Sequence, residues 1–244
     1  MTGIDAMITA IKLNNCDKLQ APPKQMRKIN PTRRSVSGQY AFRGELAIPF
    51  ESTLERDFII RCEFQHSVLD IIAQPAEIKF RTANKREYTY TPDFLVYYKL
   101  GSRSYENYPK PMLVEVKPQE QWKKHWRKWL PKWKAARRYA IQRGWEFRIY
   151  DESRIRDQVL KNIKYLERYL RIHSEPQDIE LLINTVSSMG SCTVDYLLTR
   201  HFPGIDRERG LNFIWSLVAK RLLNCDISAR LSLSTELWEI NHYE

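Results

Sequence analysis

The apolar run from Met112 to Lys117 carries two charged residues, Glu115 and Lys117, and constrains the fold more than any other feature. A short aliphatic run between two prolines is typical of a buried strand. Because side chains alternate along a strand, Glu115 and Lys117 share one face while Val116 points to the other. Charged groups in a buried strand are costly unless they bind something. We therefore expect a sheet with a functional site at the end of this strand.

The elements around this strand alternate between helix and strand. Ser52-Thr-Leu-Glu55 is a capping-box pattern and predicts that a helix begins there. The full set of expected elements is a helix over 52–65, strands over 76–80, 88–98 and 112–117, a helix from Pro118 to Gly144, a strand over 145–150 and a helix over 151–172. Pro131 is expected to kink or split the long helix. This order predicts an α/β fold with a mixed sheet flanked by helices.

The chain length of 244 residues fits one large domain or two modest ones. Residues 1–50 contain four prolines and a basic polar run, and we expect an N-terminal basic arm instead of a packed element. Residues 51–172 form the predicted main domain, and His173 to Pro176 is the expected linker. Residues 177–244 predict helices over 178–188, 193–201 and 207–223 and a terminal strand-like run. We interpret this second unit as a small, mainly α, winged-helix-like domain.

The positive charge is confined to the first part of the chain. The net charge is +11, but residues 1–150 carry 28 Lys and Arg against 15 Asp and Glu, and the remainder carries 12 against 14. Lysine and arginine gain free energy beside a polyanion through counterion release, so a phosphate-rich partner is expected there. A solvated basic face without a specific partner is the alternative.

Several classes of protein are disfavoured by what the sequence does not contain. No run approaches the ~18 apolar residues that a membrane span needs, and we expect a soluble, cytoplasmic protein. The four cysteines, Cys16, Cys62, Cys192 and Cys225, are widely spaced and are expected to be reduced. No histidine-based metal motif or phosphate-binding P-loop is present.

A second carboxylate begins the preceding strand, at Thr91-Pro92-Asp93. If the strands over 88–98 and 112–117 pair, Asp93 meets Glu115 and Lys117 at one end of the sheet. Two carboxylates suit Mg²⁺, with Mn²⁺ as a substitute, and a nearby ammonium can position an attacking water. The pattern predicts metal-assisted phosphodiester hydrolysis. In the alternative, Glu115 and Lys117 form a simple ion pair, and Asp93 merely follows a turn proline.

The helix after this strand is strongly basic. Trp122, Trp126, Trp129 and Trp133 form one helical stripe with cations on either side of it. The tryptophans pack on the sheet in one interpretation, with the cations as a solvated rim. We favour DNA-backbone contacts for the cations because they directly follow the predicted site. The residues concerned are Lys123, Lys124, Arg127, Lys128, Lys132 and Lys134.

The order of elements, with Pro92-Asp93 and Glu115-Val116-Lys117, resembles the PD-(D/E)xK core of restriction-type endonucleases. The motifs STLERDF at 52–58, EFQHSV at 63–68, QP at 74–75, YTPDF at 90–94, VEVKP at 114–118 and GWEFRI at 144–149 resemble the TnsA family. The resemblance implies that Asp93 and Glu115 are metal ligands and Lys117 is the catalytic lysine. It also implies that Glu55 is an additional catalytic and metal-binding carboxylate, although service in its own capping box fits the sequence equally well. Gln74 is expected to be a buried turn amide.

The same resemblance implies an endonuclease that cuts the 5′ ends of a transposon by Mg²⁺-dependent hydrolysis. The implied partners are transposon-end DNA, a TnsB-like transposase and a TnsC-like AAA+ ATPase, in a cut-and-paste element that includes CRISPR-associated types. The C-terminal domain would dock the ATPase, and the isolated chain would cut weakly or not at all. The alternatives are a non-catalytic DNA-binding scaffold that keeps the nuclease fold, a free-standing restriction or repair nuclease, and an RNA-processing nuclease.

Overall fold

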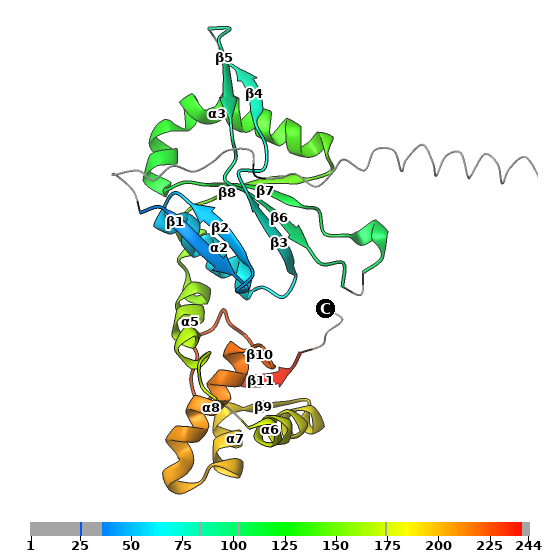
Figure 1. The fold of residues 1–244 in the computed structure, drawn as a ribbon, viewed down its shortest axis with the longest axis vertical. Helices are drawn as coiled ribbons and strands as arrows, with labels where there is room; N and C mark the ends of the chain where they lie inside the picture. Colours follow the sequence, from blue (N-terminus) through cyan, green and yellow to red (C-terminus); the bar gives the residue numbers. More distant parts are fainter. Residues whose placement is uncertain (1–24, 26–35, 83, 102, 174, 241–244) are drawn as a thin grey trace, which may run out of the picture.

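A computed structural model describes residues 25, 36–82, 84–101, 103–173 and 175–240 (Figure 1). The N-terminal part is built on a four-stranded sheet with strand order β3-β6-β7-β8. Its strands are β3 (Val68–Ala73), β6 (Phe94–Tyr98), β7 (Met112–Val116) and β8 (Glu146–Tyr150). Strand β6 pairs antiparallel with both β3 and β7, and β7 pairs parallel with β8, so the sheet is mixed, as predicted.

The pairing of β6 with β7 is the contact that places the site. Phe94 lies opposite Val114, and the N–H of Asp93 donates to the Val114 carbonyl at 3.0 Å. Because Asp93 directly precedes β6 and Glu115 directly follows Val114, the two acidic residues meet at one end of the sheet. The predicted strand pairing is confirmed.

One helix covers each face of this sheet. Helix α2 (Thr53–Phe64) is N-capped by Ser52, as the capping box predicts, and buries Phe58 and Ile59 against one face. Helix α3 (Gln119–Gln142) buries Ala135, Ala136 and Ala140 against the other face. Small residues let the helix backbone approach the sheet closely. The two apolar layers hold the strands rigidly, and the site therefore has a fixed frame.

Two predictions for strands are wrong. The run 76–80 does not belong to the central sheet, because β4 (Ile78–Arg81) pairs only with β5 (Glu87–Tyr90). These two strands form a hairpin that projects beyond the sheet beside α3 (Figure 1). The run 88–98 is interrupted before Asp93 and divides into β5 and β6, and the sequence interpretation did not identify β3. A short 3₁₀ turn (Tyr105–Asn107) lies between β6 and β7.

The predicted arm over 1–50 is wrong in its final part. Strands β1 (Gly38–Phe42) and β2 (Leu46–Phe50) form a hairpin, and Phe42, Ile48 and Phe50 are buried in the same core as α2. Burial of these three apolar side chains outweighs the disruptive effect of the nearby proline. Residues 1–24 and 26–35, which make up most of the predicted arm, lie outside the described residues.

Helix α3 differs from its prediction in two ways. It continues through Pro131, so the proline does not split it. The tryptophan stripe does not form the layer on the sheet, because the alanines do so. Trp133 is buried, but Trp126 is 44% exposed, and Trp122 donates its indole N–H to Asp151 at 2.9 Å. The expected C-terminal glycine, Gly144, has the positive φ of 71° that a helix end of this type requires.

The predicted helix over 151–172 is broken into three short elements, α4 (Glu152–Ile155), α5 (Gln158–Leu166) and a 3₁₀ turn (Glu167–Tyr169). The break occurs because Asp157 caps α5, accepting a hydrogen bond from the Leu160 N–H at 3.2 Å. This segment packs on both parts of the chain. Asp57 of α2 is buried and accepts hydrogen bonds from Arg156 and Lys164, whereas Leu166 belongs to the C-terminal core.

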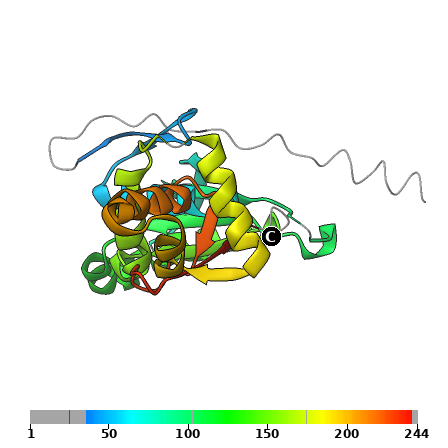
Figure 2. The ribbon, with the colours of Figure 1, turned by 90° about the horizontal axis from the view of Figure 1, so that it is seen from below.

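The C-terminal part contains three helices and a three-stranded sheet of order β10-β11-β9. Its elements are α6 (Pro176–Met189), β9 (Ser191–Thr193), α7 (Val194–His201), a 3₁₀ turn (Gly204–Asp206), α8 (Arg207–Ala219), β10 (Leu223–Cys225) and β11 (Glu236–Glu239). The three predicted helices are confirmed within a few residues at each end. Seen from below, the C-terminal helices lie in front of the central sheet (Figure 2).

Two further expectations are tested by the described part of the chain. Cys62, Cys192 and Cys225 are buried free thiols, as predicted, and Cys16 lies outside the described residues. None of the helices in the described ranges combines the length and apolar character that a membrane crossing requires.

Candidate active site

The predicted residues Asp93, Glu115 and Lys117 meet at one end of the central sheet. The Nζ atom of Lys117 lies 3.5 Å from Oδ2 of Asp93 and 3.7 Å from Oε1 of Glu115. The side chains of Asp93 and Glu115 are 14% and 1% exposed, respectively. An ammonium is therefore held between two largely buried carboxylates.

The backbone fixes Asp93 from two neighbouring strands. Its carbonyl accepts the Gln74 N–H at 2.8 Å, and its Oδ2 atom accepts the Val116 N–H at 2.7 Å. The first bond ties the Asp93 backbone to the residue that follows β3, and the second ties its carboxylate to β7. One oxygen, Oδ2, is turned toward Lys117.

Glu115 is held by two residues that lie outside the predicted motif. The Tyr90 hydroxyl, at the end of β5, donates to Oε2, and the Lys132 ammonium, in α3, donates to Oε1 at 2.8 Å. Lys132 was predicted to contact the DNA backbone from the helix surface. In the structure the Lys132 side chain is only 16% exposed and its ammonium contacts Glu115, so its contact with DNA stays a prediction.

Glu55 forms the capping box of its own helix. Its N–H donates to Ser52 Oγ at 3.2 Å, Ser52 Oγ donates to Oε1 at 3.0 Å, and the Glu51 N–H donates to Oε2 at 2.8 Å. Both carboxylate oxygens therefore have partners at the helix end. Glu55 nevertheless lies near enough to Lys117 to interact with it electrostatically. Its catalytic and metal-binding role stays a prediction.

The charges at the site perturb one another strongly. Burial, together with the neighbouring carboxylates of Glu115 and Glu55, raises the pKa of Asp93 to about 8 against the opposing effect of Lys117. Burial alone would lower the pKa of Lys117, but the three carboxylates outweigh it and raise that pKa above its usual range. Such strong shifts of buried groups with specific charged partners are typical of functional sites. They mean that Lys117 keeps its proton and acts as a donor, and that the site attracts additional positive charge.

The donor chemistry of these residues fits a hard divalent cation. Carboxylate oxygens are the preferred ligands of Mg²⁺, which is often held by one or two carboxylates and completes its coordination with water and substrate phosphates. Asp93 and Glu115 supply such a pair, and the buried amide oxygen of Gln74, which has no hydrogen-bond partner among the described residues, is a third hard donor nearby. No group of three or more histidine, cysteine, aspartate or glutamate side chains in the described ranges is arranged to hold a metal. A metal site at Asp93 and Glu115 stays a prediction.

Five of the six predicted DNA-contact cations lie on the outer surface of α3. Lys123, Lys124, Arg127, Lys128 and Lys134 are exposed. The guanidinium of Arg127 lies over the Trp126 ring, 5.4 Å from its centre. Because α3 begins two residues after Lys117, these cations are carried by the element that leads directly away from the site.

The sequence interpretation missed Tyr90 and Lys132 as site residues. Tyr90 stands three positions before Asp93, so its proximity could have been inferred from the chain alone. No pattern identifies Lys132 among the many cations of its helix, since its contact depends on how α3 docks on the sheet. Gln74 is buried and adopts a positive φ of 48°, which confirms the predicted buried turn amide.

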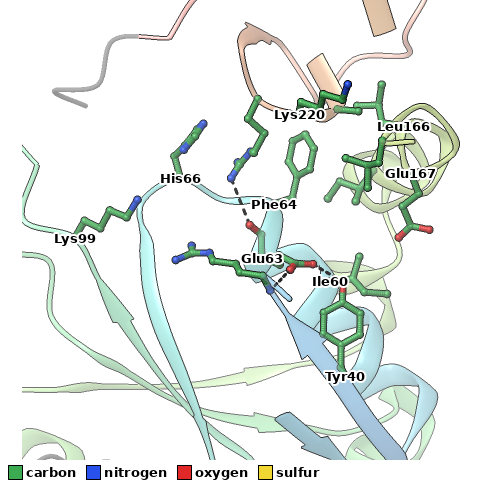
Figure 3. Close-up of a pocket in the computed structure, with 14 residues that line it drawn as sticks. Tyr40, Ile60, Glu63, Phe64, His66, Lys99, Leu166, Glu167 and Lys220 are labelled. Atoms are coloured by element: carbon green, nitrogen blue, oxygen red, sulfur yellow. Dashed lines mark hydrogen bonds between the residues drawn. The ribbon is translucent and has the colours of Figure 1, made fainter. Parts of the chain in front are cut away.

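A separate cavity of about 490 Å³ lies between α2, α5 and the end of α8 (Figure 3). Glu63 lines the cavity and accepts hydrogen bonds from the Tyr40 hydroxyl and the Arg43 N–H. None of the predicted site residues lines this cavity. The cavity lies between the N-terminal part and the C-terminal part, apart from the acidic site.

The mixed sheet flanked by helices, with Asp93, Glu115 and Lys117 at one end of adjacent strands, defines a restriction-endonuclease-like core. Residues 65–152 match the family model for the TnsA-like endonuclease N-terminal domain, and residues 154–227 match the model for the TnsA endonuclease C-terminal domain. The chain belongs to the TnsA family of transposon-associated endonucleases. None of the curated proteins compared with the chain matches it.

Proposed function

We propose that this chain hydrolyses a phosphodiester of DNA at the 5′ ends of a transposon, with Mg²⁺ held by Asp93 and Glu115. The observation that carries the proposal is the convergence of the two carboxylates on one ammonium, Lys117, at 3.5 and 3.7 Å. Family membership supports an endonuclease activity, and this convergence supports the proposal of a hydrolytic centre at the pair.

When bound, the metal would supply positive charge to the scissile phosphate and to the attacking water. The protein residues have separate tasks. The backbone bonds of Asp93 and the Tyr90 hydroxyl on Glu115 hold the two carboxylates in fixed orientations. Lys117 remains protonated, because the surrounding carboxylates raise its pKa, and it donates hydrogen bonds to the water or to a phosphate oxygen. A lysine in this state stabilises charge and does not act as the base.

The hydrolysis is balanced without a further reactant. The water oxygen forms a bond to phosphorus while the bond from phosphorus to the 3′ oxygen breaks. The leaving oxygen takes up a proton and becomes a 3′ hydroxyl, and the other product carries a 5′ phosphate. Glu55, as the third carboxylate, is proposed to act on the same centre, and the influence of Lys117 on its pKa supports this assignment.

The exposed cations of α3 are proposed to bind the DNA backbone. Lys123, Lys124, Arg127 and Lys128 lie within the first three turns of the helix that begins two residues after Lys117. Phosphate contacts of this kind position the duplex and carry no sequence preference. The end sequence would then be recognised by other subunits.

The proposed partners are a TnsB-like transposase and a TnsC-like AAA+ ATPase, acting together in the cytoplasm. The C-terminal domain is proposed to dock the ATPase. Its slight excess of acidic residues favours a protein contact over a phosphate contact. We expect weak cutting by the isolated chain, because productive geometry would require the assembled complex.

The experiment that tests the proposal maps the strand breaks on DNA carrying transposon ends, with transposase and ATPase supplied. The wild-type chain should break the 5′ ends, and Asp93→Ala should assemble normally but leave those ends joined, giving cointegrates instead of simple insertions. Unchanged cutting by Asp93→Ala would support a scaffold role for the chain. Vigorous cutting of arbitrary DNA without partners would favour a free-standing nuclease, and cutting of RNA would favour RNA processing.

A further inference from the structure

Lys132 places a second ammonium on Glu115. Its Nζ atom lies 2.8 Å from Oε1, the same oxygen that faces Lys117 at 3.7 Å. The Lys132 ammonium also lies over two aromatic rings, 4.6 Å from the centre of Tyr90 and 5.0 Å from that of Trp129. Cation–π contacts of this length are attractive, particularly where water is partly excluded. Several independent contacts therefore hold this cation beside Glu115.

Both oxygens of Glu115 are occupied by donors as a result. Lys132 binds Oε1, and the Tyr90 hydroxyl binds Oε2. Tyr90 offers a phenol hydroxyl, a neutral donor, whereas Lys132 offers an ammonium that brings a full charge. The two partners of Glu115 therefore differ in charge. A neutral donor orients the carboxylate, and a cation also cancels its charge.

A charged neighbour must oppose metal binding at the same carboxylate. Coulomb energy scales with the product of the charges, so the repulsion between a divalent ion and an adjacent ammonium is large in a site that is 1% exposed. The benefit of orienting a metal ligand is typically about 10- to 100-fold in affinity, which is smaller than such a repulsion at close range. The repulsive effect of Lys132 should therefore dominate over any orienting effect.

We propose that the Lys132 ammonium compensates the charge of Glu115 in the metal-free protein and is drawn toward a DNA phosphate when the metal enters. This inference rests on the proposed function, in which Asp93 and Glu115 hold the metal. Lys132 is carried by the helix whose exposed cations face solvent, so an approaching phosphate offers its ammonium a new anion. DNA and metal then favour each other's binding, and by linkage the coupling is reciprocal.

The first test titrates Mn²⁺ into the full chain without DNA, by calorimetry. Lys132→Met keeps the aliphatic stem and removes the charge, and it should bind Mn²⁺ about tenfold more tightly than the wild type, or better. Arg138→Met removes a charge from an exposed position on the same helix and should leave the affinity within about twofold. Tyr90→Phe, which removes only a neutral donor, should not tighten binding.

The second test measures the coupling to DNA. In a Lys117→Ala background, which the proposed function holds to be inactive, a short duplex should tighten Mn²⁺ binding when Lys132 is present. The same duplex should have a much smaller effect with Lys132→Met. Near-ultraviolet circular dichroism checks that each variant is folded, and Lys132→Gln replaces Lys132→Met if the apolar side chain disturbs packing.

Equal or weaker Mn²⁺ binding by the folded Lys132 variants would overturn the inference. The metal site itself is judged separately with Asp93→Asn, which should abolish Mn²⁺ binding. If Asp93→Asn does so and the Lys132 variants change nothing, the inference fails while the proposed function stands. If the wild type binds no Mn²⁺ in either test, both fail together.

Discussion

The Lys117 ammonium lies 3.5 Å from Oδ2 of Asp93, an oxygen that also accepts the backbone N–H of Val116 at 2.7 Å. The same strand end thus supplies a backbone N–H dipole and a side-chain charge to one carboxylate. This arrangement holds Lys117 at the mouth of the site without a direct hydrogen bond of normal length, which leaves its protons available to a substrate.

Removal of the Lys117 ammonium should therefore impair chemistry more than binding. Lys117→Met should lower the cleavage rate by about 10²- to 10³-fold, the usual cost of losing one preorganised donor to transition-state charge. DNA affinity should change little, because several other cations are proposed to contact the backbone. Single-turnover cleavage in the assembled complex, together with a filter-binding measurement, separates the two effects. A large loss of affinity with an unchanged rate would contradict this role.

The raised pKa of Asp93 predicts a pH-dependent stability for the metal-free protein. The folded-state pKa of about 8 exceeds the ordinary aspartate value near 4, so the folded state holds this proton more tightly than the unfolded chain. That contribution to stability is complete below pH ~4 and is lost as pH rises through ~8. Asp93→Asn cannot lose the proton and should gain stability relative to the wild type across this range.

Thermal unfolding in EDTA at several pH values measures this effect. The melting temperature of Asp93→Asn minus that of the wild type should grow from pH 5 to pH 9. Addition of Mn²⁺ should raise the wild-type value at the higher pH and leave the variant unchanged. A difference that shrinks with rising pH would show that Asp93 is ionised in the metal-free site.

Glu55 caps its own helix, and a suitable substitution can separate this structural role from a catalytic one. Glu55→Gln keeps a side chain that can still bond to Ser52 and Glu51, but it removes the charge near Lys117. If Glu55 is the third catalytic carboxylate, cleavage should fall by at least about tenfold with little change in stability. Ser52→Ala is the matched control, because it should lower the free energy of unfolding by about 1 kcal/mol and leave cleavage intact. Normal cleavage by Glu55→Gln would assign the residue to the cap alone.

The meeting of Asp93 with Glu115 could be predicted from the sequence because it follows from strand pairing and a two-residue spacing. Both are local rules that need no knowledge of the rest of the fold. The hairpin over 38–50 also left a signal, the alternation of Tyr40 with Phe42 and of Ile48 with Phe50, which the prolines of this region obscured. Strand β3 was missed for a different reason, since a short apolar run after a helix is ambiguous between continuation and strand.

The contact between Lys132 and Glu115 could not be predicted in this way. It depends on the rotation and height at which α3 docks, which the buried Ala136 and Ala140 determine through tertiary packing. Helical spacing alone does not distinguish Lys132 from the other cations of its helix. The sequence could not decide the role of Glu55, because the same motif is consistent with a helix cap and with a catalytic carboxylate.

The exposed cations of α3 should contribute affinity that depends strongly on salt. Replacing Lys123, Lys124, Arg127 and Lys128 by glutamine should reduce the slope of log affinity against log salt by about 0.9 for each lost phosphate contact. Lys161→Gln, an exposed position on α5, is the control and should leave the slope unchanged. Fluorescence anisotropy with a short duplex at several salt concentrations gives these slopes. An identical slope for the fourfold variant would show that α3 does not lie along DNA.

The most direct test of the central claim is anomalous diffraction from crystals soaked in Mn²⁺. The proposed site predicts a peak between Asp93 and Glu115 in the wild type and its loss in Asp93→Ala crystals of the same form. A wild-type map without a peak at this position, even with DNA bound, would contradict a metal-dependent hydrolytic centre at these two carboxylates.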